Sequence, residues 1–217
     1  MMDSAYKRIV VKIGSNVLTQ PNGFPDLARI EHLVDQIVAL KKQGTAVVMV
    51  SSGAVAAGRS MINISEKHDA VAARQLLASI GQIKLINTYL SLFERHDLLC
   101  SQVLVTKEDF RDRKHYLNIK NCLSILLKHK VIPVINENDV VSVTELMFTD
   151  NDELAGLVAS MLDADALVIL SNVDGIYDGD PKSPGAKVIE EIKNVLIWLS
   201  VDDRVCQFID IMVVDIP

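Results

Sequence analysis

The stretch VIPVINENDVVSVTELMFTDNDELAGLVASMLDADALVIL, residues 131–170, decides the fold. It begins with a short apolar run at 131–135 and later enters an apolar-periodic segment at 154–162. A second continuous apolar run follows at 166–170. This order predicts a buried strand, a helix and another buried strand. Strands that are apolar on both faces are typical of a parallel sheet covered by helices, so the stretch predicts an α/β fold.

The rest of the chain repeats the same alternation. Apolar runs predict strands at 7–13, 45–50 and 98–105, and helical spacing predicts helices at 27–43, from 54 onward, at 70–94 and at 114–129. Asp26 is the expected cap of the first helix. The helix at 70–94 is expected to bury an apolar face made of Leu76, Leu77, Ile80, Ile83, Leu85 and Ile86. We therefore expect a three-layer α/β/α sandwich with a mostly parallel central sheet.

Composition limits the classes of protein to consider. The chain has 217 residues and a net charge of −6, so no basic surplus is present to neutralise the phosphates of a nucleic acid. No apolar run approaches the roughly twenty residues that span a bilayer, and no signal peptide precedes the first strand. Cys100, Cys122 and Cys206 form no Cys-x-x-Cys pair and are expected to be buried free thiols. We expect a cytoplasmic protein without nucleic-acid or membrane partners.

Two polar clusters stand out within the opening stretch. Asn-Glu-Asn-Asp at 136–139 follows a predicted strand, and Asp-Asn-Asp-Glu at 150–153 opens a predicted helix. Carboxylates and amides in these places suit the binding of an amino or metal cation, although Asp and Asn are also the usual capping and turn residues. Two such clusters within twenty residues favour a binding site.

Four predicted strands end in polar or glycine residues. These ends are Gly14-Ser15-Asn16, Ser51 to Ala54, Asn136 to Asp139, and Ser171 to Gly175. Ligands of open parallel sheets gather outside the carboxyl ends of the strands, and glycine lets the backbone approach a ligand closely. The four ends together predict one pocket.

A lysine lies inside the first predicted strand. Lys12 shares a face with Val10, whereas Val11 and Ile13 lie on the other face. A buried lysine is unfavourable unless it is paired or binds an anion, and its place beside Gly14 favours a phosphate contact. The alternative is an edge strand whose lysine discourages aggregation.

The segment GAVAAGRS, residues 53–60, nearly fits the phosphate-loop pattern but has Arg59 where that pattern requires lysine. We interpret it as a helix start with packing glycines.

These motifs together resemble the amino acid kinase superfamily, and its glutamate 5-kinase branch in particular. The matching segments are VVKIGS (10–15) with VLT (17–19), SSGAVAAG (51–58), RQLLA (74–78), GQ (81–82), QVLVT (102–106), PVINEND (133–139), DND (150–152), and NVDGIY (172–177) with DP (180–181). The resemblance runs from residue 8 to about 192. It implies ATP-dependent phosphorylation of the γ-carboxylate of L-glutamate, the first step of proline biosynthesis.

The resemblance also implies roles for individual residues. Lys12 would contact the transferring phosphate, and Asp152 would orient the catalytic lysines. The implied glutamate-binding residues are Ser52, Gly53, Asp139, Asp150 and Asn151, and those facing ATP are Lys12, Gly14, Ser171 and Asn172. Mg²⁺ would be carried by the nucleotide phosphates, without a metal site made of protein side chains. Proline as a feedback inhibitor and a homo-oligomeric assembly are further implications.

The chain departs from the resemblance after residue 192. The family's second glycine-rich block, whose lysine neutralises the transferring phosphate, is absent, and residues 195–217 contain no glycine. We interpret 1–192 as an incomplete kinase domain and 193–217 as a divergent tail. The hypothesis for the tail is a truncated or shifted reading of a kinase gene. Because the second glycine-rich block is absent, we expect weak or no kinase activity. The alternatives are a superfamily kinase for acetylglutamate, aspartate, uridylate or carbamate, and an amino-acid-sensing domain without kinase activity.

Overall fold

The computed structural model describes residues 6–64, 69–142, 151–171, 175, 178, 183, 185–187 and, for the backbone, 210–215. Six parallel strands form one sheet in the order β3-β4-β2-β1-β5-β6. The strands are β1 (Arg8–Ile13), β2 (Ala46–Ser51), β3 (Cys100–Val105), β4 (Ile132–Glu137), β5 (Ala166–Ser171) and β6 (Asp210–Asp215). The predicted parallel sheet is confirmed.

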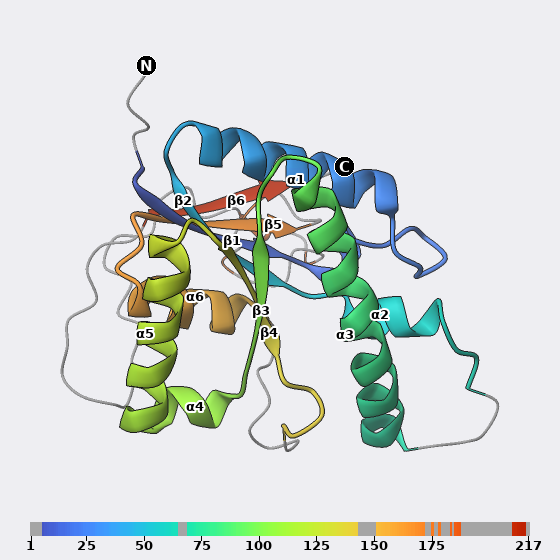
Figure 1. Ribbon diagram of the computed structural model, residues 1–217. Coiled ribbons are helices and arrows are strands. Elements are labelled where there is room, and N and C mark those ends of the chain that lie inside the picture. The colour runs from blue at the N-terminus through green and yellow to red at the C-terminus, as the bar shows by residue number, and fades with distance from the viewer. Residues whose placement is uncertain are drawn as a thin grey trace.

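Helices cover both faces of the sheet, which confirms the three-layer sandwich (Figure 1). The helices α1 (Leu27–Lys42), α2 (Ala54–Arg59) and α3 (Ala70–Glu94) pack on one face, and α4 (Lys107–Arg111), α5 (Arg113–Lys128) and α6 (Asn151–Met161) pack on the other. Side chains of β1 alternate between the layers: Val11 and Ile13 join the core under α1 to α3, whereas Val10 joins the core under α5 and α6. The alternation expected around Lys12 is therefore present.

Most element boundaries follow the sequence prediction, and the exceptions have physical causes. Asp26 caps α1 as expected, because its carboxylate accepts a hydrogen bond of 3.1 Å from the Arg29 N–H. Two short elements were not predicted, the 3₁₀ turn η1 (Ser15–Val17) and α4. Strand β6 is a third addition, because it lies in the segment assigned to a divergent tail and pairs along the whole of β5.

The predicted apolar face of α3 is wrong at Ile83, whose side chain is 62% exposed. The buried stripe instead contains small and polar residues among the large apolar ones: Leu77, Ala78, Gly81, Gln82, Leu85, Tyr89 and Phe93. Gly81 lies in this stripe because α3 meets α2 there at very short range. A Cβ atom on Gly81 would lie 1.8 Å from the carbonyl oxygen of Ala54, and one on Gly58 would lie 2.1 Å from that of Leu77. The packing glycines expected in 53–60 are confirmed.

By length and composition, α3 is the one described helix that would span a membrane, with a mean hydropathy of 1.2. No such segment was expected from the sequence. Tyr89 and Phe93 of this helix are fully buried in the core formed with α1 and the sheet, so we interpret α3 as a core helix.

The cysteines differ from the expectation of buried thiols. Cys122 is exposed and Cys100 is half-buried, and Cys206 lies outside the described residues. Burial raises the pKa of the Cys100 thiol to about 11, with Glu94 contributing in the same direction, so little thiolate forms there at neutral pH.

Candidate functional site

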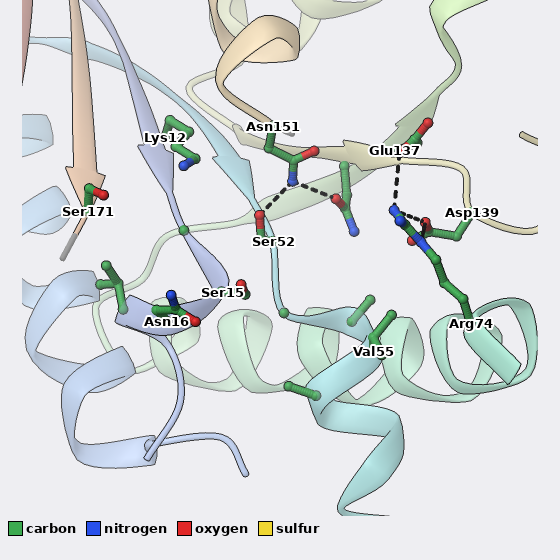
Figure 2. A pocket seen from close by; sticks show the side chains of 16 residues that line it. Lys12, Ser15, Asn16, Ser52, Val55, Arg74, Glu137, Asp139, Asn151 and Ser171 are labelled. Carbon is green, nitrogen blue, oxygen red and sulfur yellow. Dashed lines mark hydrogen bonds and ion pairs between the residues drawn. The ribbon is translucent and has the colours of Figure 1, made fainter. Parts of the chain in front are cut away.

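A cavity of about 360 Å³ opens at the carboxyl ends of four neighbouring strands, β4, β2, β1 and β5. This is the edge of the sheet where the sequence predicts a pocket. Seven of the predicted site residues line the cavity: Lys12, Gly14, Ser52, Gly53, Asp139, Asn151 and Ser171 (Figure 2). The pocket is therefore assembled from residues far apart in the sequence, each placed by the end of a strand or the start of a helix.

Lys12 lies on a central strand and is paired. Its Nζ atom is 2.6 Å from Oδ1 of Asp152, in the first turn of α6, and its side chain is 9% exposed against 42% for the aspartate. Because β1 lies between β2 and β5, the alternative of an edge-strand lysine is wrong. The ion pair accounts for the burial of the lysine and holds its ammonium group at the cavity.

A buried acidic group forms the opposite side of the cavity. Glu137 at the end of β4 and Asp139 just beyond it are both almost fully buried. Arg74 of α3 reaches both: its Nε donates to Asp139 Oδ1 at 2.7 Å, and its Nη2 donates to Glu137 Oε2 at 3.4 Å (Figure 2). Two carboxylates and one guanidinium leave a formal charge of −1. This corner of the cavity is therefore suited to one further cation.

A chain of amide groups separates the lysine from the acidic group. The Nδ2 atom of Asn151 donates to Ser52 Oγ at 2.8 Å and to Asn136 Oδ1 at 3.0 Å (Figure 2). The Nδ2 atom of Asn136 in turn donates to Gln82 Oε1 at 3.0 Å. Asn136 and Gln82 are buried, and the hydrogen bond between them satisfies one polar atom of each side chain.

Hydrogen bonds of the preceding residue, Ser51, fix the loop that carries Ser52. Ser51 Oγ donates to the carbonyl oxygen of Ser52 at 3.0 Å and lies 2.8 Å from the hydroxyl of Tyr89. Complete burial raises the pKa of Tyr89 well above its ordinary value, so the phenol stays protonated. Because the one hydrogen of the Ser51 hydroxyl is donated to Ser52, the Tyr89 hydroxyl is the donor to Ser51. Gly53 follows with φ of +106°, a left-handed conformation that favours glycine, and α2 begins at the next residue.

The structure thus gathers most predicted site residues, and their roles stay predictions. Asp152 reaches the cavity through Lys12. Asp150 and Asn172 lie outside the described residues. Asn136 and Glu137 belong to the first polar cluster, which the sequence places at the pocket without a separate role for either residue. Arg74 and Gln82 were given no role, although both lie in segments that carry the family resemblance, RQLLA (74–78) and GQ (81–82).

Among the residues that the structure describes, no three His, Cys, Asp or Glu side chains converge as a metal-binding group. Glu137 and Asp139 are engaged by Arg74, and Asp152 by Lys12. The donor set described at this cavity therefore does not make a protein-held metal site.

We expect Arg74→Met to destabilise the fold by about 2 kcal/mol, because it leaves two buried carboxylates without their cation. The value is below the loss for a fully buried pair, since the guanidinium side chain is 46% exposed. Urea unfolding of the wild type and variant measures the difference. The matched control is Arg95→Met, which breaks an ion pair with Glu31 whose partners are 60% and 43% exposed; it should change stability by less than about 0.5 kcal/mol. Equal losses in both variants would contradict the buried role of Arg74.

The chain is similar to known proteins along most of its length. The sequence pattern of the amino acid kinase family matches residues 7–195. The glutamate 5-kinase of Bacteroides thetaiotaomicron is 55% identical over 193 residues, which are 89% of this chain and 54% of that protein. The glutamate 5-kinase of Chlorobaculum tepidum is 54% identical over 187 residues, 86% of this chain and 51% of the relative. The chain thus spans about half the length of these curated relatives.

A third curated relative is covered over more of its length, and one solved structure has a similar fold. The glutamate 5-kinase of Clostridium acetobutylicum is 40% identical over 193 residues, which cover 88% of this chain and 72% of that protein. Among solved structures, the UMP kinase of Bacillus anthracis has a TM-score of 0.54 at 18% identity and covers 84% of this chain and 72% of its own. At this identity the likeness supports the α/β fold alone.

Proposed function

Because this chain belongs to the amino acid kinase family, we propose that it carries the substrate-binding part of a glutamate 5-kinase. Such an enzyme transfers the γ-phosphoryl group of ATP to the γ-carboxylate of L-glutamate, as the first step of proline biosynthesis. The identity to proteins of that name supports the substrate assignment. The chain spans about half the length of the first two, so the complete reaction is part of the proposal.

One observation carries the proposal: a single cavity has a cation at one side and a net negative corner at the other. Lys12 lines the first side, and Arg74, Glu137 and Asp139 form the second. L-Glutamate has an ammonium group at one end and a carboxylate at the other. Its ammonium complements the corner of charge −1, and this orientation directs its γ-carboxylate toward Lys12 and the phosphates of ATP.

We assign roles to the cavity residues on this basis. Asp139 and Asn151 accept hydrogen bonds from the substrate ammonium, with the carboxylate of Asp150 adding to them, while Ser52 and Gly53 hold the substrate from the β2 end. Lys12 contacts the transferring phosphate, and Asp152 keeps the lysine in place. Gly14, Ser171 and Asn172 are assigned to the nucleotide side. The spacing of these residues around one cavity supports the assignment for those that the structure describes.

The reaction requires positive charge in the site but no general base. A γ-carboxylate is deprotonated at neutral pH, so its oxygen attacks the γ-phosphorus directly while the bond to the β–γ bridging oxygen breaks and ADP leaves. Bringing two anions together is unfavourable unless fixed cations and donors offset the repulsion. Lys12 supplies such a charge. Mg²⁺ bound to the nucleotide phosphates would neutralise more of the negative charge.

For the whole protein we also propose an inhibitor, an assembly state and a location in the cell. Proline is a feedback inhibitor, since it shares the ammonium and α-carboxylate of glutamate. The enzyme assembles as a homo-oligomer. It works in the cytoplasm without nucleic-acid or membrane partners, in keeping with the net charge of −6.

Titration calorimetry tests the proposal. We expect L-glutamate to bind one site per chain, and aspartate, N-acetylglutamate, UMP and carbamate to give no comparable heat. N-Acetylglutamate is the sharpest control, because it keeps both carboxylates but lacks the ammonium that the acidic corner requires. Binding of another panel member in place of glutamate would overturn the substrate assignment.

Titration with ATP and Mg²⁺, and an assay for ADP release, separate a kinase from a sensor. Binding of both ligands with glutamate-dependent ADP release, even at a low rate, supports the kinase. Glutamate or proline binding without ATP binding supports the amino-acid-sensing alternative instead.

A further inference from the structure

We propose that Gln82 is a positioning residue that sets which atom of Asn151 faces the substrate. Gln82 lies on α3, buried behind the cavity, and does not line it. Its effect would be transmitted through Asn136, the amide that connects it to Asn151. The inference rests on the proposed function only for the identity of the ligand, because the hydrogen-bond chain is a property of the protein alone.

The hydrogen-bond chain from Gln82 to Asn151 starts at its buried end. Gln82 Oε1 accepts from Asn136 Nδ2 at 3.0 Å, and this contact fixes the rotation of the Asn136 amide. With its nitrogen toward Gln82, Asn136 presents its oxygen to Asn151, where it accepts the 3.0 Å hydrogen bond. An amide has one acceptor side and one donor side, so each group in the chain determines the orientation of the next.

The consequence appears at the cavity. Both hydrogens of Asn151 Nδ2 are used, one toward Asn136 and one toward Ser52 Oγ at 2.8 Å. Figure 2 shows this nitrogen directed at both partners and the side-chain oxygen of Asn151 turned away from them. The oxygen is thus available as an acceptor for a substrate ammonium. Ser52, which accepts from Asn151, keeps its own hydrogen to donate to an anionic group.

If the amides of Asn136 and Asn151 both rotated by half a turn, Asn151 would no longer offer an acceptor to the ligand and Ser52 would no longer offer a donor. If Asn136 turned its oxygen toward α3, its nitrogen would face the nitrogen of Asn151, and two donors would oppose each other. Asn151 would then turn as well and present N–H groups to the ammonium. Gln82 disfavours this state because its Oε1 atom accepts a hydrogen bond from Asn136 Nδ2. Asn136 is buried, so it would lose this partner without gaining water in its place.

Two substitutions of similar size separate this role from general packing. Gln82→Glu keeps an acceptor toward Asn136 in either rotation of the carboxylate, whereas Gln82→Met fills the space without one. We expect Gln82→Met to weaken L-glutamate binding about 10- to 100-fold and to leave the affinity for glutarate, which lacks the ammonium, nearly unchanged. Gln82→Glu should restore most of the preference for glutamate over glutarate. Thermal melts of both variants establish that binding is measured on folded protein.

The outcomes separate this inference from the proposed function. If the wild type binds glutamate and Gln82→Met keeps the full preference over glutarate, the positioning role is overturned and the function stands. If the wild type binds no glutamate, the proposed function fails, and the side-chain amide signals of Asn151 in the ¹H–¹⁵N spectrum of the free protein decide the inference. A shift in Gln82→Met that Gln82→Glu does not show supports it, and unchanged signals in both overturn it. The Asn151→Asp variant assigns these signals by their loss.

Discussion

Lys12→Met is expected to lower glutamate-dependent ADP release about 100- to 1000-fold, the loss typical of removing one charge-stabilising group from an active site. Methionine matches the length of lysine without its charge, so the cavity keeps its shape. The fold should lose less stability than it does when Asp152 is replaced, because the Asp152 side chain is 42% exposed and keeps part of its contact with water, while its buried Oδ1 atom loses the ammonium. The measurements are single-turnover phosphoryl transfer with labelled ATP and a thermal melt of each variant.

The matched control is Asp152→Asn, which removes the exposed partner of the same pair. It leaves the buried ammonium of Lys12 without its carboxylate, so we expect a lower melting temperature than for Lys12→Met. Calorimetry should show glutamate binding weakened in Lys12→Met by about 10-fold or less, because the γ-carboxylate loses a cation while the acidic corner that holds the ammonium is untouched. A loss of binding as large as the loss of phosphoryl transfer, or a melting temperature below that of Asp152→Asn, would contradict a role of Lys12 in phosphoryl transfer.

Gly81→Ala should destabilise the protein by at least about 3 kcal/mol, which for a chain of this size lowers the melting temperature by roughly 6–12 °C. The added Cβ would lie 1.8 Å from the Ala54 carbonyl oxygen and 2.3 Å from the Gly58 nitrogen. Both are backbone atoms and cannot rotate away, so α2 and α3 must separate. Helix propensity alone predicts the opposite sign, a gain of about 1 kcal/mol for alanine over glycine.

The control for this substitution is Asn87→Ala, on the exposed side of the same helix. It changes helix propensity without adding a contact and should alter stability by less than about 0.5 kcal/mol. Gly58→Ala is a second test of the same packing, because its Cβ would lie 2.1 Å from the Leu77 carbonyl oxygen. A Gly81→Ala protein that melts at or above the wild-type temperature would contradict the packing of α2 against α3.

Local features of the fold were predictable because their causes are local. The cap at Asp26, the apolar run of β1 and the full extent of α3 each follow from neighbouring residues. The short helix α4 was missed although its capping signal is in the sequence. The Asp109 carboxylate accepts from the Thr106 N–H at 2.7 Å, but five residues are too few to show helical periodicity.

Features that depend on a distant partner were not predictable. Ile83 is apolar yet exposed, because the buried side of α3 also has to place Gly81 against the backbone of α2, which the apolar pattern does not reveal. The sequence ends the fourth strand at Ile135, since Asn136 and Glu137 are polar, but β4 continues through both residues. Their burial is made possible by Gln82 and Arg74, which approach from another part of the chain.

The candidate site shows the same division. The cluster at 136–139 and the pairing of Lys12 followed from polar residues at the ends of apolar strands, which the sequence displays directly. The contacts of Arg74 and Gln82 could not be predicted from helical spacing, because polar residues on a helix normally face water. Only the family resemblance marks the segments in which they lie. Their contacts depend on the angle at which α3 crosses the end of β4, and that angle is set by tertiary packing.

The contact of α2 with α3 at two glycines also determines how the cavity can move. Carbonyl oxygens of one helix rest against the glycine backbone of the other, so the two helices cannot slide or tilt independently. The Gly53 cap, at the start of α2, and Arg74, on α3, are thereby carried by one rigid body. Any movement of this wall of the cavity must therefore carry both elements together.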